Sequence, residues 1–505
     1  MAYALFALMT VIPNQDILAD AIQAQSILTD PRIVLAFPGQ KHGGPLEYPA
    51  AVVAEWIFPG NYFANGLVRP FIAFFIGFVT AKLFVVLFQE APKWAFLLSV
   101  LAGPTVMHGL IGSEENPVGV WWLQPNWVLG WLFTVSGAYA VAMALRSVDQ
   151  KSWSVRITYL AGGLLIGLGF YSHPAIILLI VPLMVLVLLR GKLRIMGTII
   201  ALTGAFLGVI PAAISYVVNA GVNTWDPSHG AFISWSYYKS IGSAILGLDG
   251  RSEPAAGLLP FGFGLPPTTE VIPGGLQSFY IAFLLALIVL GSVVGIRRSL
   301  KSREPLGALG AISVSWASLV AMQFLFVTFI NPVWLYSASY TILFWLTVGA
   351  IPVLFTPKWL AATLASLIIA VEALSLVSHN WTYFTSGPSA LNEKIRVMDE
   401  KIRIAGELES EGVYAVFGSY YDAIPIGYAS GSNLRTLTNR YNRFPLTESE
   451  LKLDAVRIAI NGSPTDEWGD ESLAHVQKEC SLSVVPAVDN FEVWECPPGA
   501  LVFNK

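Results

Sequence analysis

Long apolar runs recur along most of this chain, and they constrain its fold more than any other feature. About eleven of them reach or approach the roughly 20 residues that a helix needs to cross a bilayer. They are Met1–Ile12, Leu67–Phe88, Trp94–Ile111, Trp127–Leu145, Ile157–Phe170, Ala175–Leu189, Ile195–Val218, Phe279–Ile296, Leu306–Ile330, Tyr336–Leu354 and Trp359–Val377. Only 12% of the residues are charged, against about 25% in soluble domains. The sequence therefore predicts a polytopic α-helical membrane protein, with residues 1–378 as its transmembrane module; the short first run could instead be an interfacial segment.

Basic residues in the short connections give the orientation. With eleven spans, the connections that hold Lys or Arg all fall on one face. These residues are Lys93, Arg146, Lys151, Arg156, Arg190, Lys192, Arg194, Arg297, Arg298, Lys301, Arg303 and Lys358. Positive charge gathers on the cytoplasmic side of membrane proteins. We therefore expect the opposite face to carry the loops 13–49, 112–126 and 219–278 and everything after residue 378.

The tail, residues 379–505, differs from the rest in composition. A charged amphipathic helix starts at about Leu391, and short apolar strands alternate with helical stretches after it. The predicted strands are Val413–Phe417, Leu434–Leu437, Ala455–Ile460, Ser483–Val485 and Phe491–Glu495, with helices at Tyr421–Tyr428 and Glu471–Glu479. This alternation indicates a small extracytoplasmic α/β domain. Both cysteines, Cys480 and Cys496, lie in it, and an oxidising compartment would favour a disulfide between them.

Asp16 is the first candidate for chemistry. It lies at the outer mouth of the first span, in the polar segment 13–49. A carboxylate there can orient an attacking hydroxyl or accept its proton, and ionisable groups near a membrane core are expensive to keep. The alternative is a structural role, because Asp16 precedes a helical pattern and aspartate is a good N-cap. The two roles are compatible.

Further ionisable groups gather on the same face. Glu114 and Glu115 stand side by side in the loop 112–126, where they would hold an acceptor or a cation, or form a solvated turn. A departing phosphate needs positive charge or hydrogen-bond donors around it. The candidates for that role are Lys41, His42, Arg69, Lys239, Arg251 and His229, although Arg69 could instead contact lipid headgroups.

Several classes of function find no support in the sequence. The net charge of −4 offers no basic surface for nucleic acid. The chain shows no His/Cys metal spacing, no Walker loop and no G-x-S-x-G nucleophile elbow. No cofactor is therefore indicated, and dependence on a divalent cation stays open.

Short motifs along most of the chain resemble the C-type glycosyltransferase superfamily (GT-C), in the branch of protein O-mannosyltransferases and lipid A aminoarabinose transferases. Bacterial members of that branch have D-E-A-x-x-A-x-Q-A-x-x-I-L followed by G-G-x-L-E. The matching positions are Asp16, Ala21, Gln23, Ala24, Ile27 and Leu28, then Gly43–Glu47. Arg69-Pro70 and the turn Gly169–Pro174 are also similar. One departure is Ile17, which stands where the family often has a second acidic residue.

The resemblance implies a bacterial plasma-membrane enzyme that transfers a sugar from a polyprenyl-phosphate donor to an acceptor hydroxyl, with inversion, at the extracytoplasmic face. The acceptor would be a lipid, a polysaccharide or a protein. Asp16 would act as the base or orient the acceptor, while Glu47, Glu114 and Glu115 would assist acceptor or metal binding. Lys41 and His42 precede the Gly-Gly turn, where relatives place a cation that contacts phosphate.

Two alternatives belong to other classes of function. A transporter or flippase for a lipid-linked sugar would share the spans and outer loops, but such proteins usually show internal repeats and charged groups at the midplane. A non-catalytic scaffold whose outer domain binds a partner would need no acidic loops at the mouths of its spans.

Overall fold

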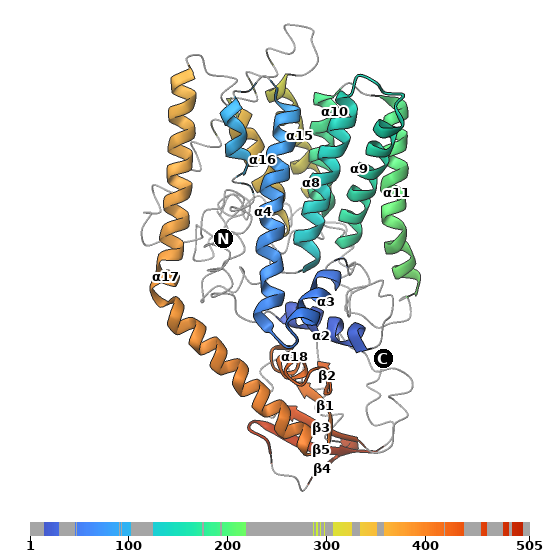
Figure 1. Cartoon of the computed structure of the whole chain (residues 1–505), viewed down its shortest axis with the longest axis vertical. Coiled ribbons are helices and arrows are strands. Elements are labelled where there is room, and N and C mark those ends of the chain that lie inside the picture. Colours follow the sequence, from blue (N-terminus) through green and yellow to red (C-terminus); the bar gives the residue numbers. More distant parts are fainter. Residues whose placement is uncertain are drawn as a thin grey trace. The chain divides into compact units, whose positions relative to one another are not determined.

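The computed structural model of this chain divides into two compact units. Residues 1–68, 212–227 and 386–505 form one, called here the α/β unit, and residues 69–211 and 228–385 form the other, called the helical unit. The structure describes residues 15–29, 46, 48–89, 91, 93–100, 102, 125–173, 176–191, 194–218, 286, 289–290, 293, 297, 307–325, 334–350, 358–418, 420–438, 456–461, 478–483 and 487–497. Figure 1 shows the elements of both units.

Apolar helices make up the helical unit. They are α4 (Tyr62–Leu87), η1 (Lys93–Ala95), α5 (Phe96–Val100), α8 (Pro125–Arg146), α9 (Trp153–Ser172), α10 (Ile177–Arg190), α11 (Ile195–Val218), α15 (Ala308–Leu325) and α16 (Trp334–Ala350). Within the described residues, α8, α9 and α11 each contain an apolar stretch long enough to cross a bilayer, and α4, α10, α15 and α16 contain shorter ones. The chain is therefore a helical membrane protein.

The helices lie close to the predicted spans. α11 has the bounds predicted for the seventh span, and α8, α9 and α10 cover the fourth, fifth and sixth. The N-terminal run and most of the eighth span, Phe279–Ile296, lie outside the described residues. The count of eleven spans therefore stays a prediction.

The C-terminal end of α4 is capped by arginines from two other helices. Arg146 of α8 and Arg190 of α10 donate hydrogen bonds to the carbonyl oxygen of Leu87, at 3.2 and 3.0 Å. The Arg190 guanidinium also lies 5.6 Å from the centre of the Phe88 ring. Cations stabilise the last carbonyls of a helix. Because α4, α8 and α10 all end here, these two basic connections share one face of the helical unit, the face predicted to be cytoplasmic.

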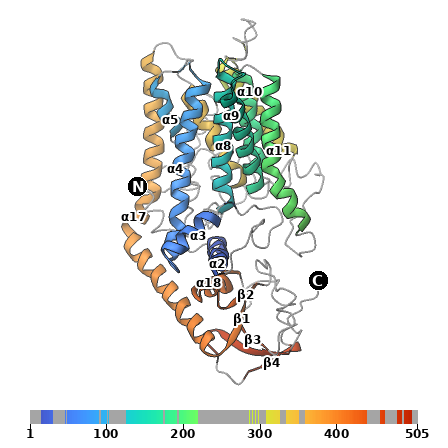
Figure 2. The same ribbon diagram turned by 45° about the vertical axis from the view of Figure 1, so that its right-hand side comes forward.

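Small residues allow α9 and α11 to pack backbone to backbone. A Cβ atom at Gly163 would overlap the carbonyl oxygen of Ala201, and one at Gly167 would overlap that of Ala205. The approach is reciprocal, because a Cβ at Gly204 would overlap the carbonyl of Leu160 on α9. Figure 2 shows the two helices side by side. Helix pairs in membranes gain much of their stability from such close packing.

We expect the variant Gly163→Ala to lose roughly 1–3 kcal/mol of stability, the usual cost of overpacking, because α9 and α11 must move apart. The measurement is thermal unfolding of the purified protein in detergent. Gly406→Ala is the matched control, since a Cβ there meets no atom within 4 Å. That variant should keep its stability or gain up to about 1 kcal/mol from better helix propensity. Equal midpoints for the two variants would contradict the close packing.

A five-stranded mixed sheet forms the core of the α/β unit. Its strands are β1 (Val413–Gly418), β2 (Arg435–Thr438), β3 (Val456–Asn461), β4 (Ser481–Leu482) and β5 (Phe491–Cys496), in the order β2-β1-β3-β5-β4. β1 pairs in parallel with β2 and β3, whereas β5 pairs antiparallel with β3 and β4. The strands predicted at Val413–Phe417, Leu434–Leu437, Ala455–Ile460 and Phe491–Glu495 correspond to β1, β2, β3 and β5. The predicted helix Glu471–Glu479 lies almost entirely outside the described residues.

Helices cover one face of this sheet. Helix α18 (Tyr420–Ala429) connects β1 to β2, as parallel strands require. It joins the last turns of α17 (Lys358–Ser410) over a common apolar core with β1, β3 and β5. Helix α17 crosses the predicted boundary at residue 378. It runs as one helix, whereas the sequence predicted a span and a separate amphipathic helix. A helix already started gains one hydrogen bond for each residue added, which favours this continuation.

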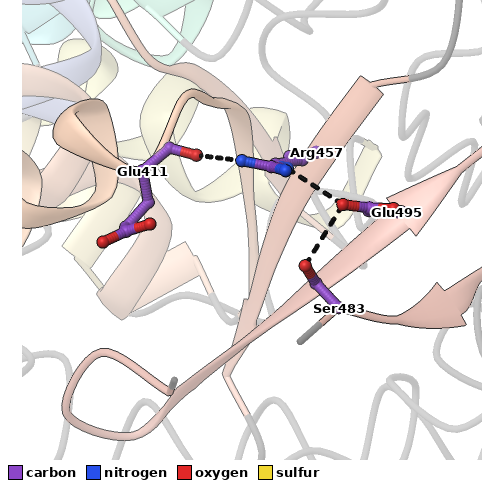
Figure 3. Close-up of polar contacts among 4 residues, drawn as sticks. All are labelled: Glu411, Arg457, Ser483 and Glu495. Atoms are coloured by element: carbon purple, nitrogen blue, oxygen red, sulfur yellow. Dashed lines mark hydrogen bonds and ion pairs between the residues drawn. The ribbon is translucent and has the colours of Figure 1, made fainter. Parts of the chain in front are cut away.

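Two covalent and polar links tie the antiparallel strands together. Cys480 and Cys496 form a disulfide between the start of β4 and the end of β5. Beside it, Arg457 of β3 donates hydrogen bonds to the Glu495 carboxylate at 3.1 Å and to the Glu411 carbonyl at 2.9 Å (Figure 3). Ser483 donates to the same Glu495 oxygen at 3.2 Å. These contacts fasten β3, β4 and β5 to the turn that follows α17.

Candidate functional site

Asp16 lies on α2 (Gln15–Thr29), near the N-terminal end of the described part of that helix. The helix forms because Ala, Gln, Ile and Leu fill most of its positions, and these residues suit a helix interior. The described part of this helix begins at Gln15, next to Asp16, so the predicted N-cap role of Asp16 stays a prediction. Asp20 lies one turn later on α2 and is only 2% exposed.

The middle of α2 is buried against the rest of the α/β unit. Its residues Leu18, Ala21 and Ile22 share an apolar cluster with Ile424 and Tyr428 of α18. Met398 of α17 completes that cluster. Packing on one side fixes both the rotation and the axial position of a helix, because core side chains interdigitate with few voids. The turn that carries Asp16 therefore extends from a helix held firmly in place.

A buried carboxylate joins α2 to its neighbours. Glu55 of α3 (Tyr48–Ile57) is 1% exposed. Its Oε1 atom accepts a hydrogen bond from the Tyr428 hydroxyl at 3.0 Å. Its Oε2 atom accepts from Gln25 Nε2 at 3.2 Å and from the backbone N–H of Gly60 at 3.1 Å. We call these four residues the Glu55 junction.

Gln25 extends the junction to the turn after α18. While its Nε2 atom donates to Glu55, its Oε1 atom accepts a hydrogen bond from the Ser432 hydroxyl at 2.7 Å. Side-chain contacts thus join α2, α3, α18 and the turn after α18, and the contacting residues lie up to 407 positions apart in the sequence. A satisfied polar network in a low-dielectric interior rigidifies its surroundings and specifies one arrangement.

The structure leaves most of the other predicted site residues undescribed. Arg69 lies on α4, and only its backbone is described. The candidates outside the described residues are Lys41, His42, Glu47, Glu114, Glu115, His229, Lys239 and Arg251. Within the described part, no three His, Cys, Asp or Glu side chains gather as a metal site would require. The roles given to these residues stay predictions.

Sequence reasoning did not single out the Glu55 junction. One signal was available, because Glu55 is the sole charged residue in the apolar stretch 48–58. An isolated carboxylate in such a stretch is expensive and is often kept for a purpose. Its partner Tyr428 carried no comparable signal, since a tyrosine on a helix usually serves as a core residue.

Solved structures similar to this chain exist. One is ArnT from Cupriavidus metallidurans bound to undecaprenyl phosphate, with 10% sequence identity, a TM-score of 0.41, and coverage of 98% of this chain and 96% of that one. Another is the apo state of the same protein, with 11% identity, a TM-score of 0.39, and coverage of 100% and 98%. No protein-family model and no curated protein matches the sequence.

Proposed function

We propose that this protein is a membrane glycosyltransferase that moves a sugar from a polyprenyl-phosphate donor to an acceptor hydroxyl. The observation that carries the proposal is the setting of Asp16. It stands on α2, which packs against the rest of the α/β unit through an apolar cluster and the Glu55 junction. A catalytic group needs a fixed position within hydrogen-bond reach, about 3 Å, of the proton that it receives.

The proposed reaction is a direct displacement. The acceptor oxygen attacks the anomeric carbon and passes its proton to the Asp16 carboxylate. The bond between that carbon and the phosphate oxygen breaks, and its electron pair leaves with polyprenyl phosphate. Attack opposite the leaving group inverts the anomeric configuration. The transition state resembles an oxocarbenium ion, and Lys41, His42, Arg69, Lys239, Arg251 and His229 are the candidates for stabilising the departing phosphate.

The location of this chemistry is part of the proposal. We assign the α/β unit to the extracytoplasmic side of a bacterial plasma membrane. Its disulfide suits an oxidising compartment, and the arginine-capped end of α4 suits the cytoplasmic face. The predicted division, a transmembrane module 1–378 and an outer domain 379–505, is retained for the polypeptide, with residues 1–68 packed in the same unit as the outer domain. Glu47, Glu114 and Glu115 would hold the acceptor or a divalent cation.

The test is incubation of the purified protein with a panel of radiolabelled polyprenyl-phosphate sugars and candidate acceptors. We expect one donor to release polyprenyl phosphate in step with transfer of its label to an acceptor. The panel also identifies the sugar. Movement of intact donor across vesicle membranes without release of polyprenyl phosphate would replace this proposal with a flippase.

A further inference from the structure

Helix α3 buries its charged residue and exposes large apolar residues, which is the reverse of a helix on a water-facing surface. Its buried side consists of Tyr48, Ala51, Ala54 and Glu55, which includes the only charged residue in the helix. Its outer side carries large apolar residues: Val53 is 51% exposed, Trp56 73% and Ile57 52%. Phe58, the residue after the helix, is 53% exposed.

These apolar residues form one stripe. Positions 53, 56 and 57 are spaced three and four residues apart, so their side chains project from the same side of the helix. No charged or polar side chain interrupts the stripe. Leaving such a surface in water costs about 25 cal/mol for each Å² of apolar area. Contiguous apolar patches on a protein surface usually mark a contact with protein or membrane.

The short connection between α3 and α4 indicates that the apolar stripe contacts lipid. α4 begins at Tyr62, five residues after Ile57, and five residues extend at most about 18 Å. α4 has 26 residues, which at about 1.5 Å each is enough to cross the hydrocarbon core. The stripe therefore lies within about 18 Å of the start of α4, the helix predicted to enter the bilayer at the headgroup level. Tryptophan, the most exposed member of the stripe, is enriched at that level in membrane proteins.

The turn between the two helices holds α3 in this orientation. The Phe58 N–H donates to the Ala54 carbonyl at 2.8 Å, and the Asn61 N–H donates to the Phe58 carbonyl at 3.0 Å. Gly60 adopts a φ of +68°, which favours glycine, and its N–H donates to Glu55. Rotation of α3 would withdraw Glu55 from Gly60, Gln25 and Tyr428 together. These contacts keep Glu55 on the buried side of α3 and the apolar stripe on its exposed side.

We propose that α3 is an interfacial membrane anchor. Val53, Trp56 and Ile57 insert among the headgroups and upper acyl chains of one leaflet, at the depth of about 5–10 Å that is typical of amphipathic interfacial helices. The Glu55 junction on the other side of α3 holds α2 and α18. The helix thereby fastens the α/β unit to the bilayer surface. This inference is independent of any transferase activity.

Site-directed spin labelling tests the anchor in the full-length protein. Both native cysteines are in the disulfide, so a nitroxide will attach only to an introduced cysteine. The variants Val53→Cys and Ile57→Cys are labelled and reconstituted into vesicles of phosphatidylethanolamine and phosphatidylglycerol. Collision rates are then measured with oxygen, which concentrates in lipid, and with a nickel chelate, which stays in water. We expect oxygen to exceed nickel severalfold at both positions.

Two matched variants calibrate the measurement. Phe78→Cys on α4, where the native side chain is 48% exposed, is the lipid standard. Ile402→Cys, in the charged part of α17, is the water standard, since Ile402 is 52% exposed and thus matches Val53 and Ile57. Collision ratios at positions 53 and 57 equal to that of Ile402→Cys would overturn the anchor. Protection from both reagents would overturn it as well, because the stripe would then be covered by protein.

Discussion

The variant Asp16→Asn will transfer sugar about 10²–10⁴-fold more slowly than the wild type, the usual loss when a general base is removed. Asparagine keeps the shape of the side chain and its place on α2, but it cannot accept the proton of the acceptor hydroxyl. The loss should appear in kcat, while the affinity for the polyprenyl-phosphate donor stays unchanged. The measurement is the release of polyprenyl phosphate at saturating donor, together with donor binding to the same protein preparation.

Asp149→Asn is the matched control for this experiment. Asp149 lies in the exposed turn between α8 and α9, where its Oδ1 atom accepts hydrogen bonds from the N–H groups of Lys151 and Ser152. Asparagine retains that acceptor oxygen, so kcat should equal that of the wild type. Unchanged turnover in Asp16→Asn would remove Asp16 from the chemistry, and a non-catalytic scaffold would give that outcome.

Local sequence patterns predicted the elements well. The seventh span needed only an uninterrupted apolar run of helical length, and α11 has the predicted bounds. The strand at β5 follows from β-branched and aromatic residues between turn residues, and such local preferences act within a few positions. Arg146 and Arg190 were predicted to share a face from charge bias alone, and both bond to Leu87.

Contacts between residues far apart in the sequence could not be predicted from local patterns. Glu55 and Tyr428 are 373 residues apart, and no pattern within either segment indicates that they meet. The inward orientation of Glu55 is also hidden, because a single carboxylate beside apolar residues suggests an outward position. Only the packing of α3 against the rest of the α/β unit decides which side faces in. The setting of Asp16, which depends on this packing, was therefore beyond sequence reasoning.

The variant Glu55→Ala will destabilise the α/β unit by about 3 kcal/mol, because it leaves the buried Tyr428 hydroxyl, Gln25 Nε2 and the Gly60 N–H without their acceptor. A free-energy loss of that size raises the rate of amide exchange through unfolding of the unit by about 10²-fold, at 1.36 kcal/mol per factor of ten. The measurement is hydrogen–deuterium exchange of α18 and β1 in the full-length protein. Glu409→Ala is the control, since Glu409 is exposed and accepts a long hydrogen bond from Asn433, at 3.5 Å; exchange should stay close to that of the wild type.

Tyr428→Phe separates the buried hydrogen bond from a general loss of packing. Phenylalanine fills the same space beside Leu18 and Ile424, so this variant removes only the hydroxyl that donates to Glu55. In the double variant Glu55→Ala/Tyr428→Phe, no tyrosine hydroxyl remains to be buried without its acceptor. The destabilisation of the double variant should therefore be smaller than the sum of the two single effects, by about 0.5–3 kcal/mol, the range found for residues in direct contact. Strictly additive effects would show that Glu55 acts without Tyr428, and the link from α3 to α18 would then depend on Gln25 and Ser432.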